Sequence, residues 1–123
     1  MEDKKEVLVV EDDEGLNDIV CRYVKLAGCS ARGALDGQTA LRAVKEHVPS
    51  MVLLDLMLPD TTGFAVCEQL KRDDSTRCVP VVMMTALADD ESRRRGLACG
   101  AIEYMTKPFD PDRLIAVIRK YAT

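Results

Sequence analysis

Short apolar runs alternate along the chain with segments of helical periodicity. The strongest runs are residues 7–10, 51–54 and 81–84, and none of them alternates apolar with polar residues. Continuous apolar runs of about four residues are typical of strands buried on both faces, as in a parallel sheet covered by helices. Two weaker runs, residues 30–34 and 102–106, complete a set of five predicted strands.

Apolar residues at three- and four-residue steps predict five helices, which follow the strands at residues 16–27, 40–48, 64–70, 87–99 and 114–121. Gly28 ends the first, Asp36 caps the second with Pro49 beyond it, and Asp110 and Pro111 open the fifth. This (βα)5 alternation predicts an α/β fold with a doubly wound parallel sheet in the flavodoxin-like order 2-1-3-4-5.

Composition narrows the class of protein. A length of 123 residues fits one domain over 1–123. Seventeen basic and 21 acidic residues leave a net charge of -4, so we expect no direct contact with nucleic acid. Five cysteines without a CxxC pair argue against a disulfide scaffold or zinc ribbon. No apolar run or leader predicts a membrane segment, so we expect a cytoplasmic protein without a membrane contact.

Chemistry-bearing residues follow the carboxyl ends of the predicted strands. Glu11 and Asp12 follow the first strand, Asp55 the third, Thr85 ends the fourth and Lys107 follows the fifth. In the predicted order the first and third strands are neighbours, so the three carboxylates converge at the switch point. Two unit charges about 4 Å apart repel by about 4 kcal/mol at an effective dielectric near 20. Because Lys107 balances only one charge, Mg²⁺ is the natural addition.

Each of these residues also has a simpler interpretation. Asp13 and Glu14 fit loop solvation or the cap of the next helix. Thr85 alone fits a cap, and Lys107 alone a surface lysine. Asp55 interrupts the apolar run 51–58, where a carboxylate is costly unless it is paired or bound. Their joint position at four strand ends favours one functional site.

Four segments carry a resemblance to a known family. They read VVED at 9–12, LDLMLPDTTG at 54–63, MTA at 84–86 and TKPF at 106–109. Together with their spacing, they resemble the receiver domain of two-component response regulators, and the resemblance covers essentially the whole chain.

The resemblance implies a role for each residue of the site. Asp55 is the expected phosphoacceptor, which takes a phosphoryl group from a phosphohistidine of a sensor histidine kinase or phosphotransfer protein. Asp12 is expected to bind Mg²⁺, or Mn²⁺ in its place, directly. Glu11 acts mainly through water, and Asp55 and the backbone carbonyl of Met57 complete the ligands. Lys107 is expected to pair with Asp55 and then with a phosphoryl oxygen.

The resemblance also implies a conformational switch. Thr85 is expected to bond the phosphoryl group, after which Tyr104 turns inward; a half-buried strand residue is the simpler interpretation of Tyr104. A cis peptide before Pro108 would aim Lys107 into the site, and Pro59 and Gly63 shape the loop after Asp55.

Partners follow from the same resemblance. The kinase is expected to dock on the first helix at Glu14, Leu16, Asp18, Ile19 and Arg22. Output is expected through the fourth helix, fifth strand and fifth helix, onto a partner or a second copy of the chain. Residues 87–99 offer few apolar anchors, mainly Leu87 and Leu97, so we predict that the fourth helix is the most mobile. Arg93, Arg94 and Arg95 could form part of this output face, but three consecutive residues cannot all face one partner, so a solvated face paired with the preceding acids is the favoured interpretation.

Other functions remain open from the residues. Asp55 could serve a Mg²⁺-dependent phosphohydrolase, although the loops look short for a substrate cap, or the chain could be a scaffold that is never phosphorylated. Otherwise it is not an enzyme beyond its own phosphorylation and dephosphorylation. It encodes no output domain, and is either a stand-alone regulator or a receiver from a longer protein. Met57 and Leu87 cannot hydrogen-bond a hydrolytic water, which predicts slow self-dephosphorylation.

Overall fold

Five parallel strands form one sheet in the order β2-β1-β3-β4-β5, as predicted. The computed structural model describes residues 5–122. The strands are β1 (Glu6–Val10), β2 (Ser30–Ala34), β3 (Met51–Leu54), β4 (Val81–Thr85) and β5 (Glu103–Thr106). The helices are α1 (Glu14–Leu26), α2 (Gly37–Glu46), α3 (Gly63–Arg72), α4 (Asp90–Ala98) and α5 (Pro111–Tyr121).

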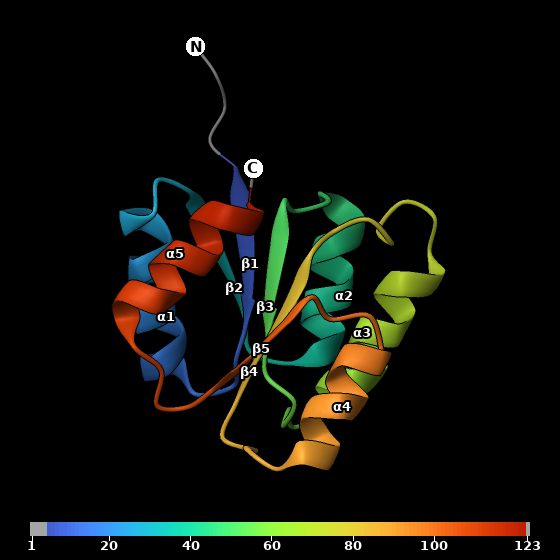
Figure 1. Cartoon of the computed structure of the whole chain (residues 1–123). Helices are drawn as coiled ribbons and strands as arrows, with labels where there is room; N and C mark the ends of the chain where they lie inside the picture. Colours follow the sequence, from blue (N-terminus) through green and yellow to red (C-terminus); the bar gives the residue numbers. More distant parts are fainter. Residues whose placement is uncertain (1–4, 123) are drawn as a thin grey trace.

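Helices cover both faces of the sheet, with α1 and α5 on one side and α2, α3 and α4 on the other (Figure 1). Successive strand residues point to opposite faces, so each apolar run feeds two cores. Within β1, Val7 and Val9 pack toward α1 and α5, whereas Leu8 and Val10 pack toward α2 and α3. This double burial explains why the runs are continuous rather than alternating. None of the helices in residues 5–122 combines the length and apolarity needed to cross a lipid bilayer.

The predicted caps are confirmed. Asp36 accepts a hydrogen bond from the Thr39 backbone N–H, and Asp110 caps α5 with Pro111 at its start. Gly28 follows Ala27, the C-cap of α1, and has a φ of 94°, a conformation that suits glycine. These residues determine where the helices begin and end. They therefore also determine which residues form the loops between strands and helices.

The buried face of α1 includes a polar residue that the apolar periodicity did not predict. Asn17 is buried beside Val20 and Val24, while Ile19, one of the expected docking residues, is 45% exposed. The inward face of α1 therefore begins with the amide of Asn17. Leu16, Ile19 and Tyr23 lie beside the loop after β5.

The predicted anchors of α4 are also corrected. The helix begins at Asp90, so Leu87 lies in the preceding loop. Leu97 lies within the helix but is 45% exposed. Gly96 is the only residue of α4 that is buried, and it lies against the ring of Tyr104. The mobility of α4 stays a prediction. The small number of buried contacts in this helix supports it.

The arginines of α4 are exposed, but among residues 5–122 they form no ion pair with the preceding acids. Instead, the Arg93 guanidinium lies 5.2 Å from the centre of the Tyr104 ring, and that of Arg95 lies 4.2 Å from the centre of the Phe64 ring. These are cation–π distances. The arginine stems thus cover aromatic surface that the sparse apolar residues of α4 leave uncovered.

Candidate functional site

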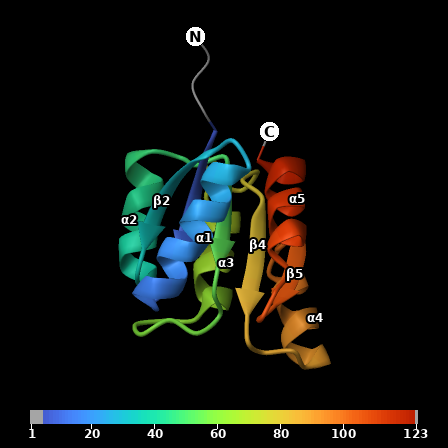
Figure 2. The same cartoon turned by 90° about the vertical axis from the view of Figure 1, so that its left-hand side faces the viewer.

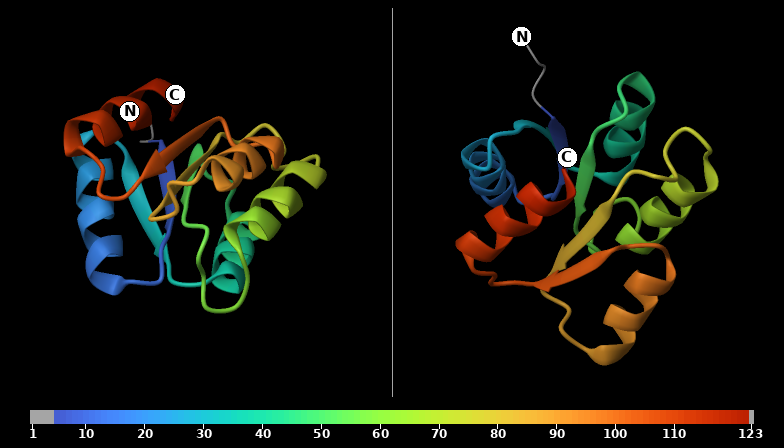
Figure 3. Two further views of the ribbon diagram at one scale, coloured as in Figure 1. Left: turned by 60° about the horizontal axis from the view of Figure 1, so that its bottom comes forward. Right: turned by 45° about the horizontal axis from the view of Figure 1, so that its top comes forward.

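Strand register brings the predicted site residues together at one edge of the sheet. Val10 of β1 pairs with Leu54 of β3, so the residues that follow them, Glu11 and Asp55, emerge side by side. The strands all run toward the same end of the sheet (Figure 2). The loops that follow them gather at that end (Figure 3, left). The predicted convergence at the switch point is therefore confirmed.

Three carboxylates form the centre of the site. Oxygens of Glu11, Asp12 and Asp55 lie within 4.8 Å of one another. Glu11 is 1% and Asp55 5% exposed, whereas Asp12 faces solvent. Carboxylate oxygens beside open solvent are the ligands that Mg²⁺ prefers, because this ion keeps several of its waters. The donor set fits a hard divalent cation.

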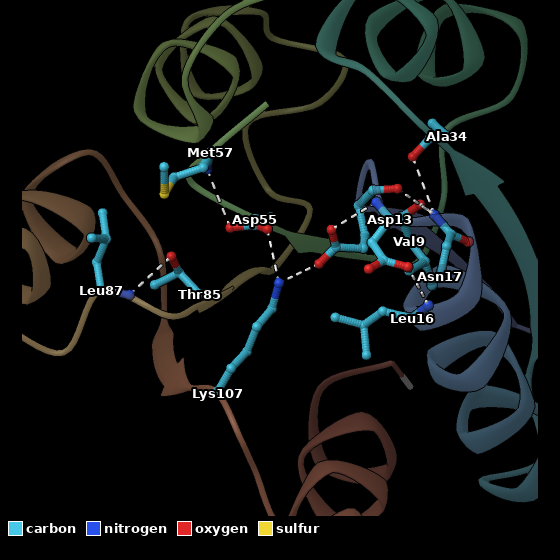
Figure 4. A network of polar contacts seen from close by, with 11 residues as sticks. Val9, Asp13, Leu16, Asn17, Ala34, Asp55, Met57, Thr85, Leu87 and Lys107 are labelled. Atoms are coloured by element: carbon cyan, nitrogen blue, oxygen red, sulfur yellow. Dashed lines mark hydrogen bonds and ion pairs between the residues drawn. The ribbon is translucent and has the colours of Figure 1, made fainter. Parts of the chain in front are cut away.

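Lys107 bridges the two buried carboxylates. Its Nζ donates to Asp55 Oδ2 at 2.9 Å and to Glu11 Oε1 (Figure 4). The Lys107 backbone N–H donates to the Thr85 carbonyl at 2.7 Å, and the peptide bond to Pro108 is cis, as predicted. Three carboxylates and one ammonium leave an excess of negative charge in the site, which a metal ion would balance.

Burial and pairing shift the titration of this group. Burial raises the pKa of Glu11 above its usual value, and hydrogen bonds from Lys107 and Asp13 offset only part of that effect. Burial alone would lower the pKa of Lys107. The hydrogen bonds and charges of Asp55 and Glu11 outweigh this effect and raise it. Lys107 therefore stays an ammonium throughout the neutral pH range.

The loop from β3 to α3 folds closely around Asp55. The Met57 N–H donates to Asp55 Oδ1 at 3.2 Å, and Met57 forms an isolated antiparallel bridge with Thr62. A side chain at Gly63 would place its Cβ 2.4 Å from the Asp55 carbonyl oxygen, so only glycine allows this approach. Gly63 therefore shapes the loop by allowing its backbone to approach that of Asp55 closely.

Thr85 and Tyr104 both contact the backbone of Leu87. The buried Thr85 hydroxyl accepts a hydrogen bond from the Leu87 N–H at 3.3 Å. The Tyr104 hydroxyl donates to the Leu87 carbonyl at 2.6 Å, and Tyr104 is only 2% exposed. The half-buried placement of an ordinary strand residue is therefore wrong. One loop residue connects the two side chains that were predicted to move together.

Asp13 has the structural role that its position after β1 favours. Its carboxylate caps α1 by accepting a hydrogen bond from the Leu16 N–H at 3.1 Å. Glu14 is exposed in the first turn of the helix. Neither belongs to the carboxylate cluster.

Asn17 is a residue that sequence reasoning missed. Its amide nitrogen lies 3.2, 3.0 and 3.3 Å from the carbonyl oxygens of Val9, Glu11 and Ala34 (Figure 4). These contacts tie α1 to the carboxyl ends of β1 and β2, next to the acidic residues. A polar residue three and seven positions before buried valines was the available signal.

Comparisons with known proteins agree with this site. A family model described as "Response regulator receiver domain" matches residues 7–119. The chain is 41% identical over 115 residues to the phosphate regulon transcriptional regulatory protein PhoB of Escherichia coli. That match covers 94% of this chain and 50% of PhoB. It is 37% identical to the DNA-binding dual master transcriptional regulator RpaA of Synechocystis, over 92% of this chain and 47% of RpaA.

The fold comparison gives the same result. The structure of the Vibrio cholerae chemotaxis protein CheY4 superposes with a TM-score of 0.89 and 25% identity, covering 96% of this chain and 98% of that one. The chain spans about half the length of the curated relatives it matches. Sequence, fold and site geometry agree, and the chain belongs to the family of response regulator receiver domains.

Proposed function

We propose that this receiver domain accepts a phosphoryl group on Asp55 in a Mg²⁺-dependent reaction and passes the change to an output partner. The observation that carries the proposal is the pairing of the buried Asp55 carboxylate with Lys107, beside Glu11 and Asp12. A scaffold that is never phosphorylated gains nothing from crowding charges that repel each other. Apart from its own phosphorylation and dephosphorylation, we propose no enzymatic activity.

The proposed reaction is a phosphoryl transfer between two side chains. An Asp55 carboxylate oxygen attacks the phosphorus atom of a phosphohistidine on a sensor kinase or phosphotransfer protein. The new bond is P–O to Asp55, and the bond that breaks is P–N, whose electron pair stays on the imidazole. Asp12, Glu11, Asp55 and the Met57 carbonyl would hold Mg²⁺, or Mn²⁺, which supplies charge neutralisation for the phosphoryl oxygens.

The remaining residues position and report the transfer. Lys107 already holds an Asp55 oxygen and carries a fixed positive charge, so it can follow the developing charge onto a phosphoryl oxygen. The Thr85 hydroxyl accepts from Leu87, which leaves its own hydrogen free to donate. We propose that a shift of Thr85 toward phosphate changes its contact with Leu87, and through Leu87 the position of Tyr104.

Docking of the kinase on α1 has support beside the site. Next to Lys107 a groove is lined by Leu16, Ile19, Tyr23, Pro108, Phe109 and Pro111. The exposed Ile19 and the half-buried Leu16 were both expected at this surface, with Glu14, Asp18 and Arg22 around them. We propose that a phosphohistidine-bearing helix of the kinase covers this groove and brings its phosphoryl group to Asp55. For a domain with such a partner we also propose a cytoplasmic location.

Output through α4, β5 and α5 stays a proposal, as does a homodimer on that face. The names of PhoB and RpaA describe proteins about twice as long as the matched region. We expected no direct contact of the chain with nucleic acid. Because RpaA is named as a DNA-binding regulator, that expectation concerns residues 1–123 alone. It does not extend to a longer protein that contains them.

Incubation with acetyl phosphate tests the proposal directly. We expect intact-mass spectrometry to show one added phosphoryl group on the native chain with Mg²⁺, and none after chelation or in Asp55→Asn. An adduct that persists in Asp55→Asn would place the acceptor elsewhere. A native chain that takes up no phosphate either from acetyl phosphate or from a panel of phosphorylated kinases would favour the scaffold function.

The lifetime of the phosphorylated form is a second expected result. Met57 is 61% exposed, and Met57 and Leu87 lie on the same side of Asp55, away from Asp13 (Figure 4). Neither side chain can orient a water molecule by hydrogen bonding. We expect the double variant Met57→Asn/Leu87→Glu to lose its phosphoryl group roughly tenfold faster, since a positioned proton acceptor typically contributes that much or more. An unchanged decay rate, measured by the same mass assay, would contradict this role.

A further inference from the structure

Asp60 connects the loop after Asp55 to the first turn of α2. Its Oδ1 accepts a hydrogen bond from the Gly37 N–H and its Oδ2 one from the Gln38 N–H, both at 2.9 Å. Gly37 and Gln38 are the first two residues of α2, whose N–H groups have no partner within the helix. These two hydrogen bonds hold the pKa of Asp60 below its usual value, so the carboxylate is ionised at neutral pH.

Close packing reinforces this connection. A Cβ added at Gly37 would lie 2.3 Å from Thr61 Cγ2 and 3.4 Å from Asp60 Oδ1, so the loop lies directly on the first turn of α2. The bridge between Met57 and Thr62 joins the two ends of the loop to each other. The segment 57–62 is therefore closed on itself and attached to α2 at Asp60.

We propose that Asp60 is a positioning residue for the metal ion, acting through the backbone of the loop that carries Met57. This inference rests on the proposed function, which assigns the Met57 carbonyl as a ligand. A backbone ligand can be aimed only by fixing its loop, because it has no rotamer of its own. The bidentate, charge-assisted contact of Asp60 with α2 supplies that fixation from outside the carboxylate cluster.

Thermodynamic linkage gives the proposal a second observable. If the contact of Asp60 with α2 raises the affinity for Mg²⁺ by some factor, bound Mg²⁺ must favour that contact by the same factor. The N–H groups of Gly37 and Gln38 should then exchange with solvent more slowly when Mg²⁺ is present. A residue that merely stabilises α2 would show no such dependence on the metal.

The experiment is a titration with MgCl₂, followed by NMR of the backbone amides, on the native chain and three variants. We expect Asp60→Ala to bind Mg²⁺ roughly tenfold more weakly, with Asp60→Asn, which keeps one acceptor, in between. Asp36→Ala is the matched control. Asp36 caps the same helix through Thr39 but makes no hydrogen bond to the loop among the described residues, so its affinity should stay within about twofold of the native value.

Each outcome separates the inference from the function on which it rests. A native chain that binds no Mg²⁺ would overturn both the proposed metal site and the role of Asp60. Native binding with an unchanged affinity in Asp60→Ala would overturn the positioning role alone. An equal loss in Asp36→Ala would assign the effect to helix stability and overturn it as well. Amide exchange at Gly37 and Gln38 that is equally fast with and without Mg²⁺ would also overturn the positioning role.

Discussion

Replacing Lys107 with methionine is expected to slow phosphoryl uptake at Asp55 by roughly 100-fold or more while tightening the binding of Mg²⁺. The first effect follows because a charge held at the reacting oxygens is typically worth that much in the transition state. The second follows because the ammonium occupies oxygens of both Glu11 and Asp55 and repels a second cation. Removing it should lower the dissociation constant of Mg²⁺ on the order of tenfold, a change of about 1.4 kcal/mol.

The same variant should be less stable, and more so at neutral than at acidic pH. Removing one partner of a buried ion pair leaves uncompensated charge. We expect a loss of about 2 kcal/mol at pH 7, below the full effect because Lys107 keeps some contact with solvent. The pKa of Glu11 is raised by burial, so its ionisation costs stability as the pH rises through that value.

Lys107 offsets part of that cost in the native chain. Its own pKa is raised above 10.5, so Lys107 is an ammonium at both acidic and neutral pH, whereas the Glu11 carboxylate that it faces is ionised to a greater extent at neutral pH. The difference between native and Lys107→Met should therefore grow from pH 4.5 to pH 7. Urea unfolding followed by circular dichroism at the two pH values measures it.

Two controls make the result specific. Lys107→Arg keeps the charge and should keep most of the stability. Lys120→Met removes an exposed lysine of α5 that lies over the Tyr121 ring and should leave Mg²⁺ affinity unchanged. Equal losses of stability at both pH values, with an unaltered affinity for Mg²⁺, would show that Lys107 does not balance the carboxylates.

The fold and the carboxylate cluster could be predicted because both depend on chain direction and strand order. Apolar runs buried on both faces imply a parallel sheet, and parallel strands end at one edge. Asp55, Thr85 and Lys107 are therefore brought to that edge by topology alone. No side-chain conformation has to be known for that prediction.

What could not be predicted depends on side-chain geometry. Periodicity marks α1 as apolar around Leu16 and Ile19 but cannot tell which side of that wide stripe meets the sheet. The structure turns Asn17 inward and leaves Ile19 to the groove beside Pro108. Likewise, the sequence predicts a solvated charge at Arg95, and only the structure shows its contact with the Phe64 ring. Such contacts join residues far apart in the sequence, so no local pattern records them.

Asn17→Leu is expected to destabilise the domain by about 3 kcal/mol, the second large effect. Leucine has the same number and branching of side-chain heavy atoms as asparagine but is bulkier and cannot donate hydrogen bonds, so the Glu11 carbonyl would lose the side-chain donor 3.0 Å away. A buried acceptor without a partner costs about 1–3 kcal/mol, and the contacts with Val9 and Ala34 are lost as well. A Cβ at Gly33 would lie 2.6 Å from Asn17 Oδ1, so the site also has little room for a changed shape.

Asn17→Asp separates the loss of hydrogen bonds from the change of shape. A carboxylate at this position would face three carbonyl oxygens, whereas the protonated acid could donate to one of them. The pKa of the new acid should be raised in the folded state, so its stability is present below about pH 3.9 and is lost as the pH rises through the folded value. The variant should therefore be weakest at pH 7 in urea unfolding. Asp18→Leu, at the exposed neighbouring position, is the matched control and should change stability by no more than about 0.5 kcal/mol. If Asn17→Leu were as mild as that control, the amide of Asn17 would not hold the loop of Glu11 in place.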